Sequence, residues 1–232
     1  MTGQFSDAID SEDKAAGSER AGGLCFLMAE ATRDLHRQAE RTGFIHDLIH
    51  RRATLSGYTL YLRNLLPAYR ALETGLSRHR WLAGFHAFSG AQLYRSDAIE
   101  SDLLAIHGPG WMSDLALLPS AIHYARRIER ISAEDPQRLI GHAYTRYFGD
   151  LSGGKILGKL IAETFSLTSS TLAFYRFDGI EDAHAFKETA RSILDGEVSA
   201  PDTCKAIVDE ASWAFGINIR LSEEIQRTTA AV

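Results

Sequence analysis

The sequence lacks most features of secreted, membrane-bound or nucleic-acid-binding proteins. Its two cysteines, Cys25 and Cys204, fit no metal-binding spacing, which favours a reducing compartment. No apolar run is long enough to cross a bilayer, and residues 1–20 lack the apolar core of a signal peptide. The net charge of -5 and the absence of a basic run argue against general nucleic-acid binding. We therefore expect a cytoplasmic, soluble protein with no membrane or nucleic-acid partner.

What the chain does contain is helical periodicity. From Gly22 onward apolar residues recur every three or four positions, and no sustained period-two pattern appears. We expect helices at about 22–42, 56–80, 97–107, 120–132, 136–165, 181–194 and 201–227. Gly43 is typical of a helix C-cap, Pro67 of a kink and Asp195-Gly196 of a break between helices, with a loop over 166–179. The pattern predicts one all-α domain over residues 21–232, preceded by a disordered polar tail over 1–20.

The segment 144–154 lies inside the longest helical pattern although it contains three glycines. Each glycine in a helix interior costs about 1 kcal/mol relative to alanine. Gly149 and Gly153 are four residues apart and share a face, and Arg146 and Asp150 form a charged stripe beside it. A helix face without side chains, next to a carboxylate, suits a flat and bulky cofactor.

This segment closely resembles the signature of the heme oxygenases. Residues 30–40 resemble the region in which that family keeps its proximal heme ligand, and weaker similarity continues to Arg227. The resemblance implies a helical bundle that holds heme b between a proximal and a kinked distal helix. It also implies oxidative cleavage of heme to biliverdin, with the IXα isomer expected, and release of CO and Fe²⁺.

The iron ligand implied by the resemblance is His36. Glu40 follows one helical turn later and can accept the other ring N–H, as carboxylates near ligating histidines do. His142 is a competitor on spacing alone, because it lies seven residues before Gly149 and thus on a similar face. The resemblance places His142 on the distal helix and so favours His36.

The resemblance also assigns the distal residues. Asp150 corresponds to the carboxylate that orders a water beside the heme, and it is predicted to be catalytic together with Gly149 and Gly153. The polar residues predicted to complete this network are Tyr69, Tyr124, Arg146 and Asn218. A surface ion pair between Arg146 and Asp150 is the alternative, but it leaves the adjacent glycines unexplained.

Heme carries two propionates, which favour cationic partners. Lys187 and Arg191 are four residues apart and match the family's propionate clamp. Some relatives have a further lysine at the position of Ala29, so one anchor is missing. The other residues that the resemblance places in the heme pocket are Tyr144, Phe174 and Phe215.

The resemblance implies that the reaction uses O₂. Because the chain contains no flavin or iron–sulfur motif, we expect a separate ferredoxin or NAD(P)H-dependent reductase to supply the electrons. Arg126, Arg127 and Arg130 are a candidate docking patch for such a donor, with Lys155 and Lys159 as further candidate members and a solvated basic face as the alternative. A monomer is expected, and a homodimer is the second possibility. The rival functions are a heme carrier or sensor that does not degrade its ligand, and a thiaminase-like hydrolase of the same fold. Asp150 argues against the carrier.

Overall fold

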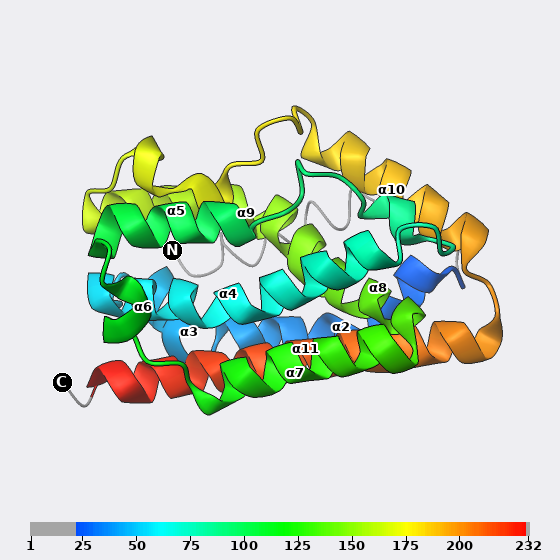
Figure 1. The fold of residues 1–232 in the computed structure, drawn as a ribbon, viewed down its shortest axis with the longest axis horizontal. Helices are drawn as coiled ribbons and strands as arrows, with labels where there is room; N and C mark the ends of the chain where they lie inside the picture. Colours follow the sequence, from blue (N-terminus) through cyan, green and yellow to red (C-terminus); the bar gives the residue numbers. More distant parts are fainter. Residues whose placement is uncertain (1–21, 231–232) are drawn as a thin grey trace.

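The computed structural model describes residues 22–230, and within this range it contains helices and no strand, which confirms the predicted all-α class (Figure 1). The tail predicted over residues 1–20 lies outside the described residues. None of the helices in residues 22–230 has both the length and the apolar character needed to cross a membrane.

The α-helices are α2 (Leu24–Glu40), α3 (Gly43–Ile49), α4 (Leu55–Arg78), α5 (Ser96–His107), α6 (Trp111–Asp114), α7 (Pro119–Glu134), α8 (Leu139–Ala143), α9 (Gly149–Phe165), α10 (Ala183–Glu197) and α11 (Pro201–Ala230). The short segments between them are η1 (Phe85–Ala87), η2 (Pro136–Arg138), η3 (Tyr144–Phe148), η4 (Ser169–Thr171) and η5 (Ala173–Tyr175). All are 3₁₀ turns except η3, which is a π-helix.

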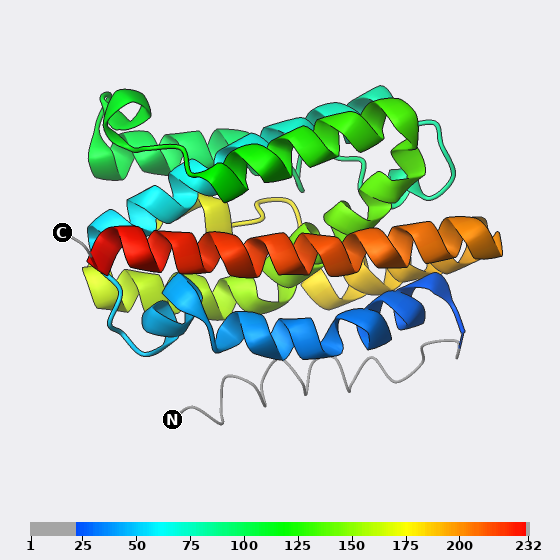
Figure 2. The same ribbon diagram turned by 90° about the horizontal axis from the view of Figure 1, so that it is seen from below.

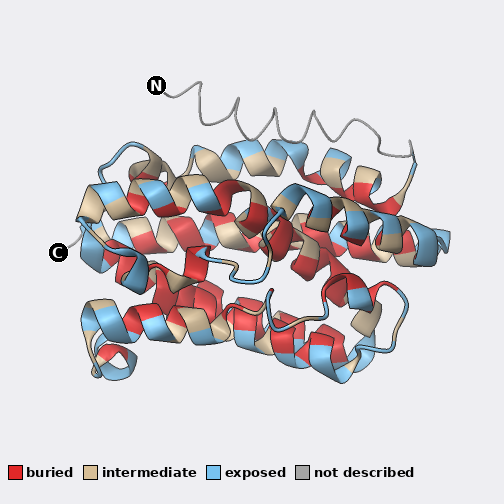
Figure 3. Ribbon diagram, turned by 90° about the horizontal axis from the view of Figure 1, so that it is seen from above, coloured by how far each residue is buried: buried red, intermediate tan, exposed pale blue. Residues whose placement is uncertain are grey.

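The longest helix, α11, is the centre of the bundle. It packs against α2, α3, α4, α7 and α8. Figure 2 shows α11 (orange to red) running between α2 (blue) on one side and α7 (green) on the other. Buried residues lie on the inward faces of the helices and exposed residues on the outward faces (Figure 3). A single hydrophobic core therefore joins all the long helices.

Two helix ends differ from the sequence prediction. Gly43 does not cap the first helix, because α2 ends at Glu40 and Gly43 begins α3. It has φ +64°, and a Cβ there would lie 2.5 Å from the backbone of Ser222, so close contact with α11 requires glycine. Asp195 and Gly196 do not end the helix either, because α10 continues to Glu197. Asp195 instead accepts a hydrogen bond of 3.0 Å from the backbone N–H of Cys25 at the start of α2.

The predicted long helix over 136–165 is not continuous. It is divided into η2, α8, the π-helical η3 and α9. The irregular turn comes directly before Gly149, and the glycines of the segment belong to the regular helix α9 that follows it. π-helical turns inside α-helices occur frequently at functional sites.

The segment 166–179 is a loop, as predicted, and it contains η4 and η5. The buried Asp102 of α5 holds η5, because its two carboxylate oxygens accept hydrogen bonds of 2.8 and 2.9 Å from the backbone N–H groups of Ala173 and Phe174. Burial raises the pKa of Asp102, and the two backbone donors oppose that rise. The loop is thereby fixed against the core.

Candidate functional site

One cavity of about 530 Å³ lies among α2, η3, α9 and α11, a volume typical of small-molecule sites. Ten of the fourteen predicted site residues line it. They are His36, Glu40, Tyr144, Arg146, Gly149, Asp150, Gly153, Arg191, Phe215 and Asn218. Residues from four separate parts of the sequence thus meet around one space.

His36 reaches the cavity from the middle of α2. Its side chain is 37% exposed, and its Nδ1 lies 3.7 Å from Glu40 Oε1, one turn further along the helix. The ring of Phe215 on α11 meets the imidazole edge-on, with the ring centres 5.8 Å apart. Glu40 and Phe215 together restrict the orientation of the imidazole.

His142, the competing histidine, is fully buried and does not line the cavity as the described residues form it. Its Nε2 lies 3.0 Å from Glu210 Oε1 on α11. Glu210 also accepts hydrogen bonds from Arg127 at 2.8 and 2.9 Å and from Arg138 at 2.5 Å. We call these four residues the Glu210 cluster. It joins η2, α7, α8 and α11, and it leaves His36 as the predicted ligand that faces the cavity.

Asp150 is at the centre of a second buried cluster, the Asp150 cluster, formed with Tyr69, Arg146 and Asn218. The Tyr69 hydroxyl donates a short hydrogen bond to one carboxylate oxygen of Asp150. Arg146 donates to the other oxygen at 3.4 Å, to the Tyr69 hydroxyl at 3.0 Å and to Asn218 Oδ1 at 2.8 Å. The side chains of Arg146 and Asp150 are only 11% and 10% exposed. This is not the solvated ion pair of the alternative interpretation.

Burial dominates the electrostatics of the Asp150 cluster. It raises the pKa of the Asp150 carboxyl above its usual value, while Arg146 and the hydrogen bond from Tyr69 oppose the rise. Burial likewise raises the pKa of Tyr69 well above that of an exposed phenol. The tyrosine therefore stays protonated and donates to the carboxylate at neutral pH.

The glycine face is open toward the cavity at Gly149. A Cβ built there would have no atom within 4 Å among the described residues. Gly153, one turn later, also lines the cavity. Gly154 faces elsewhere, because a Cβ there would contact the Tyr175 ring at 3.4 Å. The prediction of a bare helix surface beside Asp150 agrees with this arrangement.

The two predicted propionate-binding residues lie at different depths. Arg191 lines the cavity, and its guanidinium lies over the Phe148 ring at 5.5 Å and donates to Glu188 at 2.6 Å. Lys187 is 3% exposed and donates to the Ser152 hydroxyl at 2.6 Å. It is therefore linked to the cavity through Ser152 and does not line the cavity.

Three further predicted residues lie behind the cavity wall. Tyr69 lies there and donates its hydroxyl hydrogen bond to Asp150. Phe174 meets Tyr69 edge-on at 5.6 Å between ring centres, so it backs the Asp150 cluster and does not line the cavity. Tyr124 is buried between His142 and Trp213, and burial raises its pKa to about 12.

Some residues at the cavity were not selected from the sequence. Ser152 lines the cavity, and its position within the glycine-rich segment 144–154 is the sequence feature that points to it. Tyr61 also lines the cavity, but nothing in the sequence distinguishes it from other helix tyrosines. Arg127 does not contribute a free surface cation to the predicted basic patch, because its guanidinium pairs with the buried Glu210.

Known proteins give the same picture as the geometry. The family model described as heme oxygenase matches residues 24–224. Human heme oxygenase 1 is 35% identical over 206 residues, which cover 88% of this chain and 72% of the human protein. Heme oxygenase 1 of Nostoc sp. is 35% identical over 204 residues, or 88% of this chain and 86% of that protein. The crystal structure of heme oxygenase-1 from the cyanobacterium Synechocystis sp. in complex with heme matches with a TM-score of 0.85 and 30% identity, over 90% of this chain and 95% of that chain. The chain belongs to the heme oxygenase family.

Proposed function

We propose that this protein cleaves heme to biliverdin IXα, with release of CO and Fe²⁺. The observation that carries the proposal is the cavity itself, where His36 of α2 lines the same space as Arg146, Asp150 and Asn218 of the Asp150 cluster. A carrier needs only the histidine. The buried carboxylate held by a tyrosine and an arginine is the additional feature that favours an enzyme.

The residues present fit heme b. The open space above Gly149 admits a flat ring, and a larger side chain in place of Gly149 would project into that space. A single neutral imidazole is the donor set that heme iron uses in many proteins. Heme, once bound, supplies both the iron that binds O₂ and the carbon edge that is oxidised.

His36 would hold the iron through its Nε2 atom. Glu40 lies on the Nδ1 side at 3.7 Å, where it can accept the other ring proton directly or through water and keep the imidazole in one tautomer. Phe215 limits rotation of the ring. These contacts would make His36 a better oriented ligand.

Asp150 would order a water and move protons within the cavity. Tyr69 and Arg146 both donate to the carboxylate, so its position is fixed before any ligand enters. Arg146 is itself held by Asn218. Because the groups are preorganised and largely shielded from solvent, the water that they order would keep a defined direction.

Arg191 and Lys187 would bind the propionates and set the rotation of the ring about the His36–iron axis. Arg191 faces the cavity directly, and Lys187 donates to Ser152 at its wall. Tyr144 lines the same cavity and can add a hydroxyl donor. With both cations engaged, we expect oxidation at the α edge.

O₂ and an external electron donor complete the proposed reaction. The donor is a ferredoxin or an NAD(P)H-dependent reductase, the protein acts as a monomer, and its compartment is the cytoplasm. Cys25 and Cys204, both buried, fit no metal-binding spacing, which favours a reducing compartment.

The test is turnover of the heme-loaded protein with O₂ and a reductant, followed by absorption spectroscopy and chromatography of the product. We expect a bilin in the parent protein. We expect His36→Ala to lose the imidazole-type heme spectrum and to recover it when imidazole is added. His142→Asn, which retains an N–H donor for Glu210, should keep the parent spectrum.

A stable heme complex that yields no bilin in the presence of O₂ and a reductant would contradict the enzymatic function and support a heme carrier. Loss of the imidazole spectrum in His142→Asn but not in His36→Ala would reverse the assignment of the ligand.

A further inference from the structure

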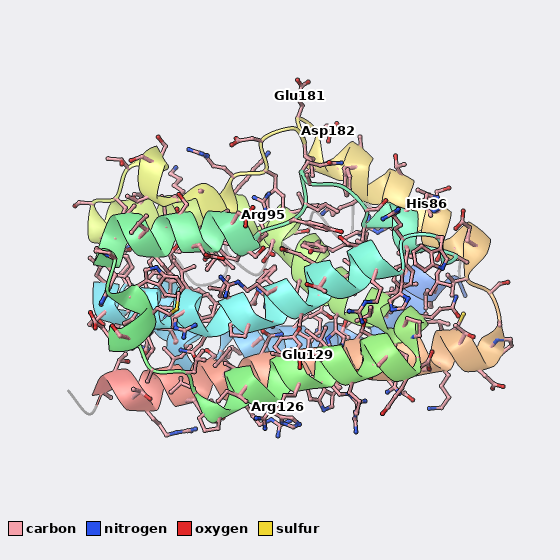
Figure 4. All side chains as sticks on the ribbon, viewed as in Figure 1. His86, Arg95, Arg126, Glu129, Glu181 and Asp182 are labelled. Atoms are coloured by element: carbon pink, nitrogen blue, oxygen red, sulfur yellow. The ribbon has the colours of Figure 1, made fainter. Side chains whose placement is uncertain are left out.

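A second cavity, of about 630 Å³, lies between α4 and α7 and is separate in its lining residues from the first. One stripe of α4 forms its floor, with Arg63, Pro67, Arg70, Thr74 and Arg78 at helical spacing. The opposite wall is a stripe of α7, and Trp111 and Met112 of α6 close one end. Figure 4 shows the labelled Glu129 on the side of α7 that faces α4, whereas Arg126 points away.

Arg63 is the unusual residue of this cavity. It is only 9% exposed, yet its buried Nε atom has no hydrogen-bond partner within residues 22–230. One face of the guanidinium is covered by the Trp111 ring at 5.2 Å. A buried donor without an acceptor normally costs free energy, so its persistence requires a reason.

The charges around Arg63 are unbalanced. Burial lowers its pKa, and the neighbouring Arg70 lowers it further. Arg70 already donates to Glu100 of α5, at 2.5 Å for its shortest contact. Three arginines face the cavity and Glu129 is the one acidic residue among its described lining, so an anion is the complement.

The remaining lining gives the size and character of that anion. Met112 is 59% exposed and Leu117 39% exposed, and both lie at the cavity beside Pro67, Ala71 and Ala125. Apolar side chains exposed together at a cavity mark a surface that a ligand can cover. A guanidinium also pairs well with a planar carboxylate through two parallel hydrogen bonds.

We propose that the cavity between α4 and α7 binds a small organic carboxylate, whose anionic group pairs with Arg63 and whose apolar body lies against Trp111, Met112 and Leu117. This site takes no part in the cleavage proposed for the cavity at His36, and it holds whether or not that cleavage occurs.

The experiment uses heme-loaded protein, so that heme fills the other cavity, and octanoate as the probe. The ¹⁵N–¹H signal of the Trp111 indole, assigned with Trp111→Phe, reports binding beside Arg63, and the Trp213 signal reports changes elsewhere. Octanoate should shift the Trp111 signal saturably. Its neutral analogue octanamide should bind about tenfold more weakly or worse, since it lacks the charge.

Variants sharpen the test. Arg63→Met should weaken octanoate by about tenfold or more, Arg63→Lys by less, and the exposed Arg126→Met should leave it unchanged. The comparison of octanoate with octanamide in the parent protein holds even if Arg63→Met fails to fold. Equal binding of the two probes, equal binding of inorganic phosphate and octanoate, or preference for an acidic peptide would each overturn the proposal.

Discussion

The molecule contains two buried ionic clusters that use similar residues for different ends. In the Glu210 cluster one carboxylate receives two arginines and a histidine, all within 3.0 Å. In the Asp150 cluster the carboxylate receives one arginine at 3.4 Å and a tyrosine hydroxyl, and it lines a cavity. The pKa of Glu210 lies well below its usual value because the hydrogen bonds and charges of His142 and Arg127 outweigh its burial, whereas burial raises that of Asp150.

The difference shows how to distinguish a structural carboxylate from a functional one. A carboxylate whose oxygens are all occupied by charged donors is fixed in one protonation state and joins helices. A carboxylate that is buried, only partly compensated and open to a cavity remains able to bind water or exchange a proton.

The largest effect is expected for Asp150→Ala. Bilin formation should fall by roughly 10²–10⁴-fold, the usual contribution of a positioned acid–base group. Oxidising equivalents should then appear as peroxidase-like oxidation of guaiacol. Bilin chromatography and a guaiacol assay measure both. Parent-rate bilin formation in this variant would remove Asp150 from the chemistry.

Glu210→Ala should chiefly affect stability. It leaves Arg127, Arg138 and His142 without their common acceptor, and breaking a buried ion pair costs about 3–5 kcal/mol. Urea unfolding measures the loss, and activity per folded molecule should stay near that of the parent. If Glu210→Ala unfolds like the parent but has lost activity, the contrast between the clusters is wrong.

Loss of the cationic clamp should alter the product and not the rate of heme binding. Lys187→Ala combined with Arg191→Ala removes charged hydrogen bonds of about 1.5–3 kcal/mol each, enough to change a rotational preference tenfold. Mixed biliverdin isomers should result, resolved by chromatography. Arg126→Ala is the matched surface control, and a β or δ isomer from the parent protein would contradict the clamp.

The pH dependence of stability should have opposite signs in the two clusters. Glu210 has a lowered pKa, so its stabilisation is present above pH 4.5 and is lost as pH falls, by roughly 1 kcal/mol between pH 7 and 4. Asp150 has a raised pKa, so its contribution falls as pH rises above 3.8. Urea unfolding from pH 4 to 7 should show two opposite changes. Glu210→Gln should be destabilised relative to the parent more strongly at pH 7 than at pH 4, whereas Asp150→Asn should escape the stability that the parent loses at Asp150 as pH rises. Equal slopes in both variants would refute the assignment.

The sequence predicted the helices that bury a continuous apolar stripe, and the glycine-rich segment identified the cavity. Short elements such as α3 and α6 were missed, because four to seven residues carry too little periodicity. The end of α10 was misplaced since the Asp195-Gly196 pair resembles a turn, whereas a tertiary hydrogen bond to Cys25 gives Asp195 another role. A short sequence pattern such as Asp195-Gly196 predicts the local structure only when no residue distant in sequence competes for its side chain.

The Glu210 cluster was not predicted for a related reason. Glu210 lies on a helix rich in acids, and its partners come from three other segments that only the fold brings together. Arg127 was consequently interpreted as part of a surface patch. The same limit applies to Lys187, whose contact with Ser152 spans 35 residues. Local spacing cannot reveal such pairs.

The π-helical turn at Tyr144–Phe148 sets the rotational phase of everything after it. One extra residue in a turn rotates the following helix by about 100° and advances it by about 1.5 Å. Removing one residue from this turn would turn Gly149 and Asp150 away from His36 while leaving each side chain chemically unchanged. The Glu210 cluster would meanwhile keep α8 in its place. The geometry of this site is thus encoded in the number of residues as well as in their identity, and chain length at one turn is a variable on which selection can act.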